Sequence, residues 1–180
     1  MNIFVLHLHP RICARYHCNK HVVKMILETC QLLCTAWHTL DPKCTVFTPP
    51  YKKTHVNHPC ARWCRASRAN YKWLCRLGLE LCKEYTHRYQ KVHKCEAWLK
   101  VLRRRVPDML DEEWTTPPAC MPNEYKSDDV VLAYRKYYVG EKASLLQYKD
   151  RSVPRFVTLA HDAPVAAEAR HDGGSRQPSS

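Results

Sequence analysis

The sequence predicts a mainly α-helical protein, with one compact domain over residues 1–158, a short extended segment at its N-terminus and a disordered tail over residues 159–180. Three observations lead to this fold class. Apolar residues recur at helical three-and-four spacing in several segments, and proline-containing connections separate these segments. The hydrophobic fraction of 45% is sufficient for a core. After about Phe156 the chain changes to Ala, Gly, Ser, Pro and scattered charge, which cannot build one.

The N-terminal half begins with residues 2–8 (NIFVLHL), which are apolar, β-branched and aromatic. This composition favours a short strand or an extended arm. Pro10 can open a helical turn that runs to about His17. The clearest helix spans residues 19–38, with Asn19 as its expected N-cap. Its predicted apolar face consists of Val23, Ile26, Leu27, Cys30, Leu33, Cys34 and Trp37.

Three further helices are predicted after residue 58. One opens near Pro59, capped by Asn57 or His58, and continues to about residue 89 with a break near Ser67. The next spans residues 95–106. The last follows a proline-rich connection, is capped by Ser127 and ends at Gly140.

Charge and cysteine content indicate the kind of partner and the cellular compartment. The formal net charge is +12, which favours a polyanion partner: nucleic acid first, an anionic membrane surface second. The sequence contains neither an apolar run long enough to span a bilayer nor a signal-peptide pattern, so we expect an intracellular protein. The 11 cysteines are then best interpreted as small buried apolar residues in a reducing compartment.

A narrow polar stripe runs along the helix over residues 19–38. His21, Lys24 and Glu28 share this stripe by three-and-four spacing, and apolar residues flank it. A stripe of this kind is typical of a cleft, where a carboxylate can transfer protons or stabilise a cation. We therefore predict a catalytic role for Glu28, with His21 and Lys24 beside it. An ordinary solvated stripe with a Lys–Glu pair is the alternative.

A basic loop over residues 51–59 (YKKTHVNHP) leads directly into a helix start. Amide and imidazole donors beside cations at a helix N-terminus favour phosphate binding, and Tyr51 and Trp63 offer rings for base stacking. A solvated loop shaped by its prolines is the alternative. The predicted nucleic-acid contacts are Lys52, Lys53, His55, Asn57, His58, Arg62 and Arg65.

Metal-ligand spacings also occur in the sequence. Cys13, His17 and His21 are four residues apart, Glu84 and His87 form a Glu-x-x-His pair, and His55 and His58 are three apart. The chain has 11 His and 11 Cys, so chance spacings are expected, and no Cys-x-x-Cys pair is present. We therefore predict no metal and no cofactor. A metal-dependent helical enzyme remains an alternative.

Four segments resemble a group of uncharacterised small proteins from phages and large DNA viruses. They are residues 18–29 (CNKHVVKMILET), 51–59 (YKKTHVNHP), 84–89 (EYTHRY) and 121–126 (MPNEYK). More distantly, the order of elements resembles the pyrimidine-dimer DNA glycosylases of the phage endonuclease V type. That resemblance implies an N-terminal α-amine that attacks the sugar carbon to form a Schiff base. A helix glutamate supports this chemistry, and basic residues hold a kinked duplex.

Carried over by residue, the resemblance places Glu28 at the glutamate and His21 at the histidine. Leu27 stands where that family has an arginine. Asn2 does not normally permit removal of Met1, so the amine is that of Met1, or a lysine such as Lys24 or Lys20 forms the imine. The resulting hypothesis is a DNA glycosylase and abasic-site lyase acting on double-stranded DNA in viral or phage repair. A non-enzymatic basic nucleic-acid-binding protein is the competing hypothesis.

Overall fold

The computed structural model of the protein describes residues 1–43 and 47–162. It confirms the predicted fold class: the described residues form helices and no strand. The predicted tail lies mostly outside the described residues. The helices are α1 (Pro10–Tyr16), α2 (Asn19–Leu40), α3 (Pro59–Cys64), α4 (Arg68–Tyr89), α5 (Glu96–Arg104), α6 (Val130–Gly140) and α7 (Arg155–Asp162), with 3₁₀ turns η1 (Asn123–Tyr125) and η2 (Ala143–Leu145).

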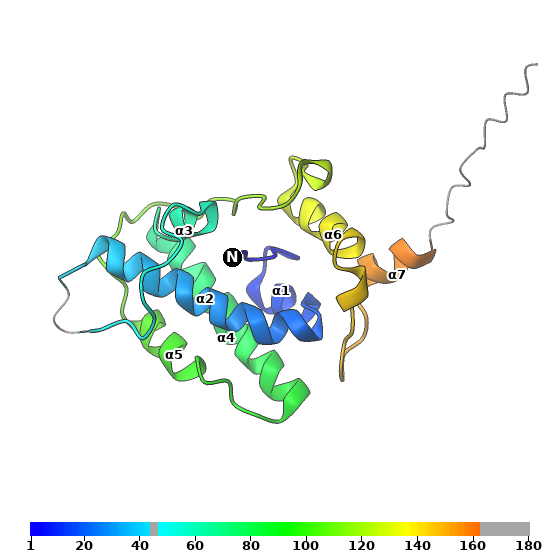
Figure 1. Cartoon of the computed structure of the whole chain (residues 1–180), viewed down its shortest axis with the longest axis horizontal. Helices are drawn as coiled ribbons and strands as arrows, with labels where there is room; N and C mark the ends of the chain where they lie inside the picture. Colours follow the sequence, from blue (N-terminus) through cyan, green and yellow to red (C-terminus); the bar gives the residue numbers. More distant parts are fainter. Residues whose placement is uncertain (44–46, 163–180) are drawn as a thin grey trace, which may run out of the picture.

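Helices α2 and α4 lie side by side and form the centre of the core, with α1, α3 and α5 packed on them (Figure 1). Gly78 of α4 permits this close packing. A Cβ atom added there would lie 2.9 Å from Thr29 Cγ2 on α2 and 3.0 Å from Leu99 Cδ2 on α5. The position therefore favours glycine despite its low helix propensity.

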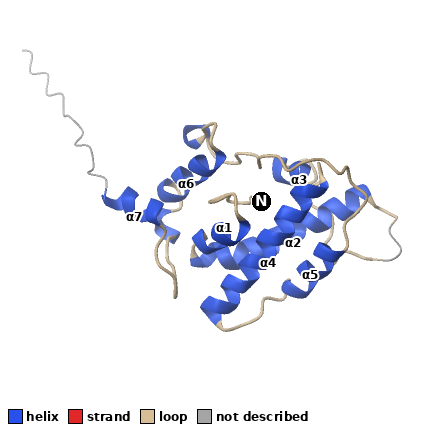
Figure 2. Ribbon diagram, turned by 180° about the vertical axis from the view of Figure 1, so that it is seen from behind, coloured by secondary structure: helices blue, strands red, loops and turns tan. Residues whose placement is uncertain are grey.

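The chain starts in the middle of the molecule, close to α2 and between α3 and α6 (Figures 1 and 2). Residues 3–6 are buried. They form no strand, because Phe4 has a left-handed backbone (φ 54°) and the Leu6 amide donates a hydrogen bond to the Phe4 carbonyl at 2.9 Å. The apolar N-terminal segment is thus an irregular arm inside the core, and the strand interpretation is wrong.

Two of the predicted helix caps are wrong. Cys18, and not Asn19, is the N-cap of α2, and the Asn19 side chain instead accepts a bond from Arg88 Nη1. Asp129, and not Ser127, caps α6 by accepting from the backbone of residues 131 and 132. The expected break near Ser67 is confirmed: Ser67 caps α4 by accepting from the Asn70 amide.

The predicted apolar face of α2 is only partly buried. Ile26, Leu33 and Trp37 lie in the core, but Val23 and Leu27 are 39% and 37% exposed. Both side chains line a groove on the surface of the molecule. At the other end of the chain, α7 continues through Asp162, so the last four residues of this helix lie within the predicted tail.

Cysteines behave as the sequence predicts. Ten cysteines lie in the described part of the chain; all ten are free thiols, nine of them buried and Cys120 partly so. Among these described residues, no helix is both long enough and apolar enough to cross a bilayer.

Candidate active site

Glu28 of α2 is the carboxylate that hydrogen-bonds the start of the chain. Its side chain is 13% exposed, and its Oε2 accepts a hydrogen bond of 2.9 Å from the backbone nitrogen of Asn2. On the outer side, Lys24 Nζ lies 3.4 Å from Glu28 Oε1. The carboxylate is therefore held between the first peptide unit and a solvent-facing cation.

Asn2 holds the arm in this position. Its Nδ2 donates to the Cys120 carbonyl at 2.7 Å, and its Oδ1 accepts from the Tyr134 hydroxyl at 2.7 Å. Oδ1 also accepts from the Ile3 amide at 2.7 Å. Bonds to α2, to α6 and to the connection before η1 therefore position the first residues from three directions.

His21 lies deeper in the molecule than Glu28. It is 6% exposed, its Nδ1 hydrogen-bonds the Tyr138 hydroxyl at 2.8 Å, and its ring centroid lies 4.4 Å from that of Phe4. Burial, with the charges of His17, Lys142 and Lys24, lowers its pKa to about 3. Seven residues of helix separate it from Glu28, a rise of about 10.5 Å. Its contacts thus hold Phe4 of the arm.

Three further side chains gather near the chain start, namely His58, Cys60 and Cys120. Cys60 Sγ and Cys120 Sγ are 3.6 Å apart. A hydrogen bond with Cys60 lowers the pKa of Cys120 to about 7, and the charges of Lys126 and the α-amine act in the same direction. Burial and the α-amine also lower the pKa of His58. Sequence analysis missed Cys60 and Cys120, because 60 residues separate them and no local spacing joins them.

The basic loop is anchored to α2 and exposes its cations. The Thr35 hydroxyl donates to the Thr54 carbonyl at 3.1 Å, and Arg65 Nη1 donates to the Val56 carbonyl at 2.6 Å. His58 Nδ1 accepts from the Cys60 amide as the N-cap of α3. Of the predicted nucleic-acid contacts, His58 and Arg65 are partly buried, whereas the exposed ones are Lys52, Lys53, His55, Asn57 and Arg62.

Of the two rings predicted for stacking, Trp63 is buried and donates its indole N–H to the Thr115 carbonyl at 3.0 Å. It cannot stack on a base, so this prediction is wrong. Tyr51 is partly exposed and lines a groove of about 550 Å³ with Val23, Leu27 and Tyr85. Lys24, Lys91 and Lys94 also line this groove, so a basic and aromatic surface borders the Glu28 helix turn.

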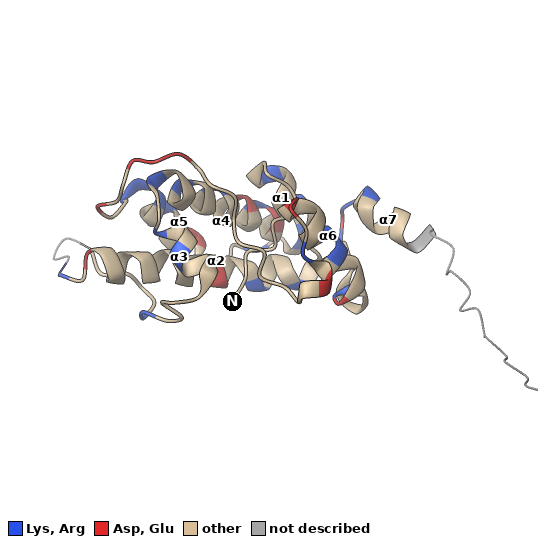
Figure 3. Cartoon of the chain, turned by 90° about the horizontal axis from the view of Figure 1, so that it is seen from above, with Lys and Arg blue, Asp and Glu red and all other residues tan. Residues whose placement is uncertain are grey.

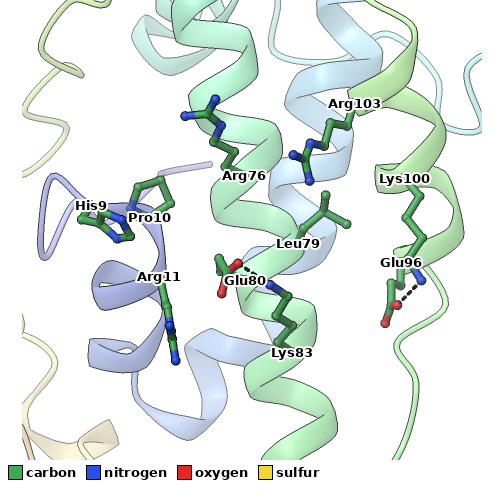
Figure 4. Close-up of a pocket in the computed structure, with 10 residues that line it drawn as sticks. All are labelled: His9, Pro10, Arg11, Arg76, Leu79, Glu80, Lys83, Glu96, Lys100 and Arg103. Atoms are coloured by element: carbon green, nitrogen blue, oxygen red, sulfur yellow. Dashed lines mark hydrogen bonds and ion pairs between the residues drawn. The ribbon is translucent and has the colours of Figure 1, made fainter.

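A second cavity, of about 520 Å³, lies between the start of α1 and the exposed sides of α4 and α5 (Figure 4). Arg11, Arg76 and Arg103 line it. Two of its lysines pair with glutamates of their own helices, Lys83 with Glu80 and Lys100 with Glu96. Neither Glu28 nor the N-terminal arm borders this cavity, which makes it a useful comparison surface.

The other spacings considered for metals have different roles in the structure. Glu84 is buried and binds Arg88 and Arg151, with Arg151 Nη2 2.9 Å from its Oε1. His87 Nε2 hydrogen-bonds the Asp150 carbonyl, and His17 Nδ1 hydrogen-bonds the Cys13 carbonyl. The structure brings neither of these histidines into a ligand set.

Fold and site together define a class: a small helical protein in which the start of the chain lies against a helix carboxylate, beside an exposed basic loop. The family model described as pyrimidine dimer DNA glycosylase matches residues 1–97. This match spans more than half of the 180 residues, and the chain belongs to that family.

The matched residues include the N-terminal arm, Glu28 and the basic loop. Searches of curated proteins and of solved structures returned no match. The resemblance to small phage and viral proteins stays a prediction, because no relative bears on it.

Proposed function

We propose that the protein is a DNA glycosylase with abasic-site lyase activity, acting on pyrimidine dimers in double-stranded DNA. Its family supports glycosylase chemistry on DNA. The observation that carries the site assignment is the 2.9 Å hydrogen bond from the Asn2 backbone nitrogen to Glu28. It joins the first peptide unit of the chain to a mostly buried carboxylate, beside which a primary amine can act as nucleophile.

In the proposed reaction, the amine nitrogen attacks C1′ of the damaged nucleotide. The C1′–N glycosidic bond breaks, and the base leaves with the bonding electron pair. The nitrogen then loses a proton to Glu28, and the C1′–O4′ bond breaks as this proton is passed to O4′, which gives a protonated C1′=N imine and a free 4′-hydroxyl group. Glu28 accepts the proton of the attacking amine and stabilises the positive charge that develops on the sugar.

Two amines near Glu28 are candidates for the nucleophile. The α-amine is one residue before the Asn2 nitrogen, and Lys24 Nζ is 3.4 Å from the carboxylate. We assign the nucleophile to the α-amine, because bonds to Asn2 fix the arm in one place. Lys24 is exposed and its side chain is free to turn away.

His21 and Asn2 are positioning residues in this proposal. The His21 ring packs on Phe4, and Asn2 is bound by Tyr134 and the Cys120 carbonyl. Both contacts hold the arm and therefore the amine. The proposed DNA contacts remain Lys52, Lys53, His55, Asn57, His58, Arg62 and Arg65, which lie on one loop and the helix that follows it.

The role of Glu28 is tested by borohydride trapping on a duplex that contains a pyrimidine dimer, in the presence of a chelator. We expect Glu28→Gln to lose about 100-fold or more of the covalent adduct while DNA binding stays unchanged. Glu96→Gln is the matched control, because Glu96, like Glu28, pairs with a lysine four residues away on its own helix. Unchanged trapping in Glu28→Gln, or loss of binding, would contradict the assignment. Binding without an adduct in any variant would leave the non-enzymatic hypothesis.

The nucleophile is identified by mapping the trapped peptide with mass spectrometry. We expect the adduct on the first residue of the chain and full trapping by Lys24→Gln. An adduct on Lys24 or Lys20 would keep the imine chemistry and overturn the assignment to the α-amine. The intact mass of the protein shows in the same experiment whether Met1 or Asn2 supplies that amine.

A further inference from the structure

His58, Cys60 and Cys120 form a compact group of nitrogen and sulfur ligands. The proposed glycosylase reaction uses neither cysteine, and it uses His58 only as a DNA contact. One ring nitrogen of His58 and the two sulfur atoms all lie within 4.8 Å of one another. Within residues 1–43 and 47–162, they are the three-residue group that brings such atoms together. The group comes from two distant segments, the start of α3 and the connection before η1.

The spacing of this group suits a tetrahedral ion. Two thiolates bound to zinc at about 2.3 Å in tetrahedral geometry lie about 3.8 Å apart. Cys60 Sγ and Cys120 Sγ are 3.6 Å apart before any ion is bound. The two sulfur atoms are thus already near the required separation, and the imidazole nitrogen, within 4.8 Å of both, must move closer to them when an ion binds.

The group formed by His58, Cys60 and Cys120 can be reached from solvent on one side. Cys60 is buried, but His58 and Cys120 are partly exposed. The Cys120 carbonyl accepts from the Asn2 side chain, so the N-terminal arm borders the group directly. A three-ligand set beside solvent leaves a fourth position for water or for the α-amine.

We propose that His58, Cys60 and Cys120 bind one divalent cation of the zinc type, with three protein ligands and an open fourth position. Two thiolates and one imidazole select zinc over magnesium or calcium, which prefer oxygen ligands. A metal on either ring nitrogen of His58 displaces the 3.2 Å bond that Nδ1 accepts from the Cys60 amide. Metal binding and the N-cap of α3 are thus coupled. This proposal does not depend on the glycosylase activity.

Titration of the full-length, untagged protein with Co²⁺ in reductant tests the site. Cobalt bound by thiolates gives a charge-transfer absorption whose intensity follows the number of thiolate ligands. We expect one Co²⁺ per chain with the intensity of two thiolates, and displacement of the cobalt by Zn²⁺. Cys60→Ala and Cys120→Ala should each lose the stoichiometric spectrum.

The matched control is Cys64→Ala, which removes a buried thiol from the same helix as Cys60 but lies outside the group. This variant should keep the full spectrum, and circular dichroism checks that all three variants fold. Absence of the thiolate absorption while both cysteines react with a maleimide would overturn the proposal. Equal cobalt binding by Cys60→Ala and Cys64→Ala, or a Cys60–Cys120 disulfide that persists in reductant, would also overturn it.

Discussion

At the scale of the residue, Glu28 differs from other helix glutamates in its partner across the fold. Glu28, Glu80 and Glu96 each pair with a lysine three or four residues away on the same helix. Glu28 also accepts a hydrogen bond from Asn2, 26 residues earlier in the chain. This long-range contact is the feature that turns an ordinary surface pair into a candidate catalytic group.

Two buried histidines make stability depend on pH. Burial lowers the pKa of His17 to about 4 and that of His21 to about 3, whereas both titrate near 6.5 in the unfolded chain. Arg88 lowers and Glu84 raises the pKa of His17, while His17, Lys142 and Lys24 lower that of His21. Since the unfolded chain binds more protons below pH 6.5, the free energy of unfolding should fall by about 2 kcal/mol per histidine between pH 7 and pH 5.

Urea unfolding at both pH values measures this loss. His21→Phe removes one titrating ring, so the difference between the two pH values should shrink by about half. An unchanged difference in His21→Phe would show that other groups cause the acid sensitivity.

At the scale of the element, Arg88 connects four segments of the chain. It is fully buried on α4, and its Nη1 donates to the His17 carbonyl at 2.8 Å. Its Nη2 donates to the Arg15 carbonyl at 3.2 Å, and Glu84 joins it to Arg151. One network of hydrogen bonds and ion pairs therefore joins the end of α1, the start of α2, helix α4 and the segment before α7.

Replacement of Arg88 should lower the free energy of unfolding far more than replacement of Arg151. Arg88→Met leaves buried carbonyls without a donor and removes the buried ion pair with Glu84, so we expect the free energy of unfolding to fall by about 3–5 kcal/mol. Arg151→Met leaves Glu84 with Arg88, so we expect about 1–2 kcal/mol. Urea unfolding of the two variants compares these losses. Equal losses would mean that Arg88 does not organise the helix ends.

At the scale of the whole molecule, positive charge is distributed over several helices and loops (Figure 3). The net charge of +12 alone therefore does not show where DNA binds. The basic loop borders the Glu28 site, whereas Arg76 and Arg103 line the cavity between α1, α4 and α5. The proposed function requires the duplex on the loop side.

This placement predicts a difference in salt dependence. Lys52→Ala with Lys53→Ala should lower the slope of log Kd against log salt concentration by about 2, since each phosphate contact contributes roughly 0.9. Arg76→Ala with Arg103→Ala removes the same charge from the comparison surface and should leave the slope unchanged. Fluorescence anisotropy with a labelled duplex measures both slopes. A larger change in the arginine variant would place the DNA on the other surface.

Local sequence patterns were enough to predict the helices and the candidate catalytic residue. Apolar periodicity placed α2 and α4, and the local signals at Pro10, His58 and Ser67 marked helix boundaries correctly. Glu28 was singled out from its place in a narrow stripe. These features depend on neighbours within one or two helical turns, and such neighbours can be read from spacing.

The contacts of those residues with distant segments depend on the tertiary fold. The fold brings the backbone nitrogen of Asn2 into a hydrogen bond with Glu28, and it leaves Leu27 partly exposed although periodicity had placed this residue in the core. It also joined Cys60 to Cys120. These outcomes depend on how the N-terminal arm enters the core and how the connection before η1 crosses it. No local pattern encodes such contacts, because their energy comes from packing between segments that are distant in the chain.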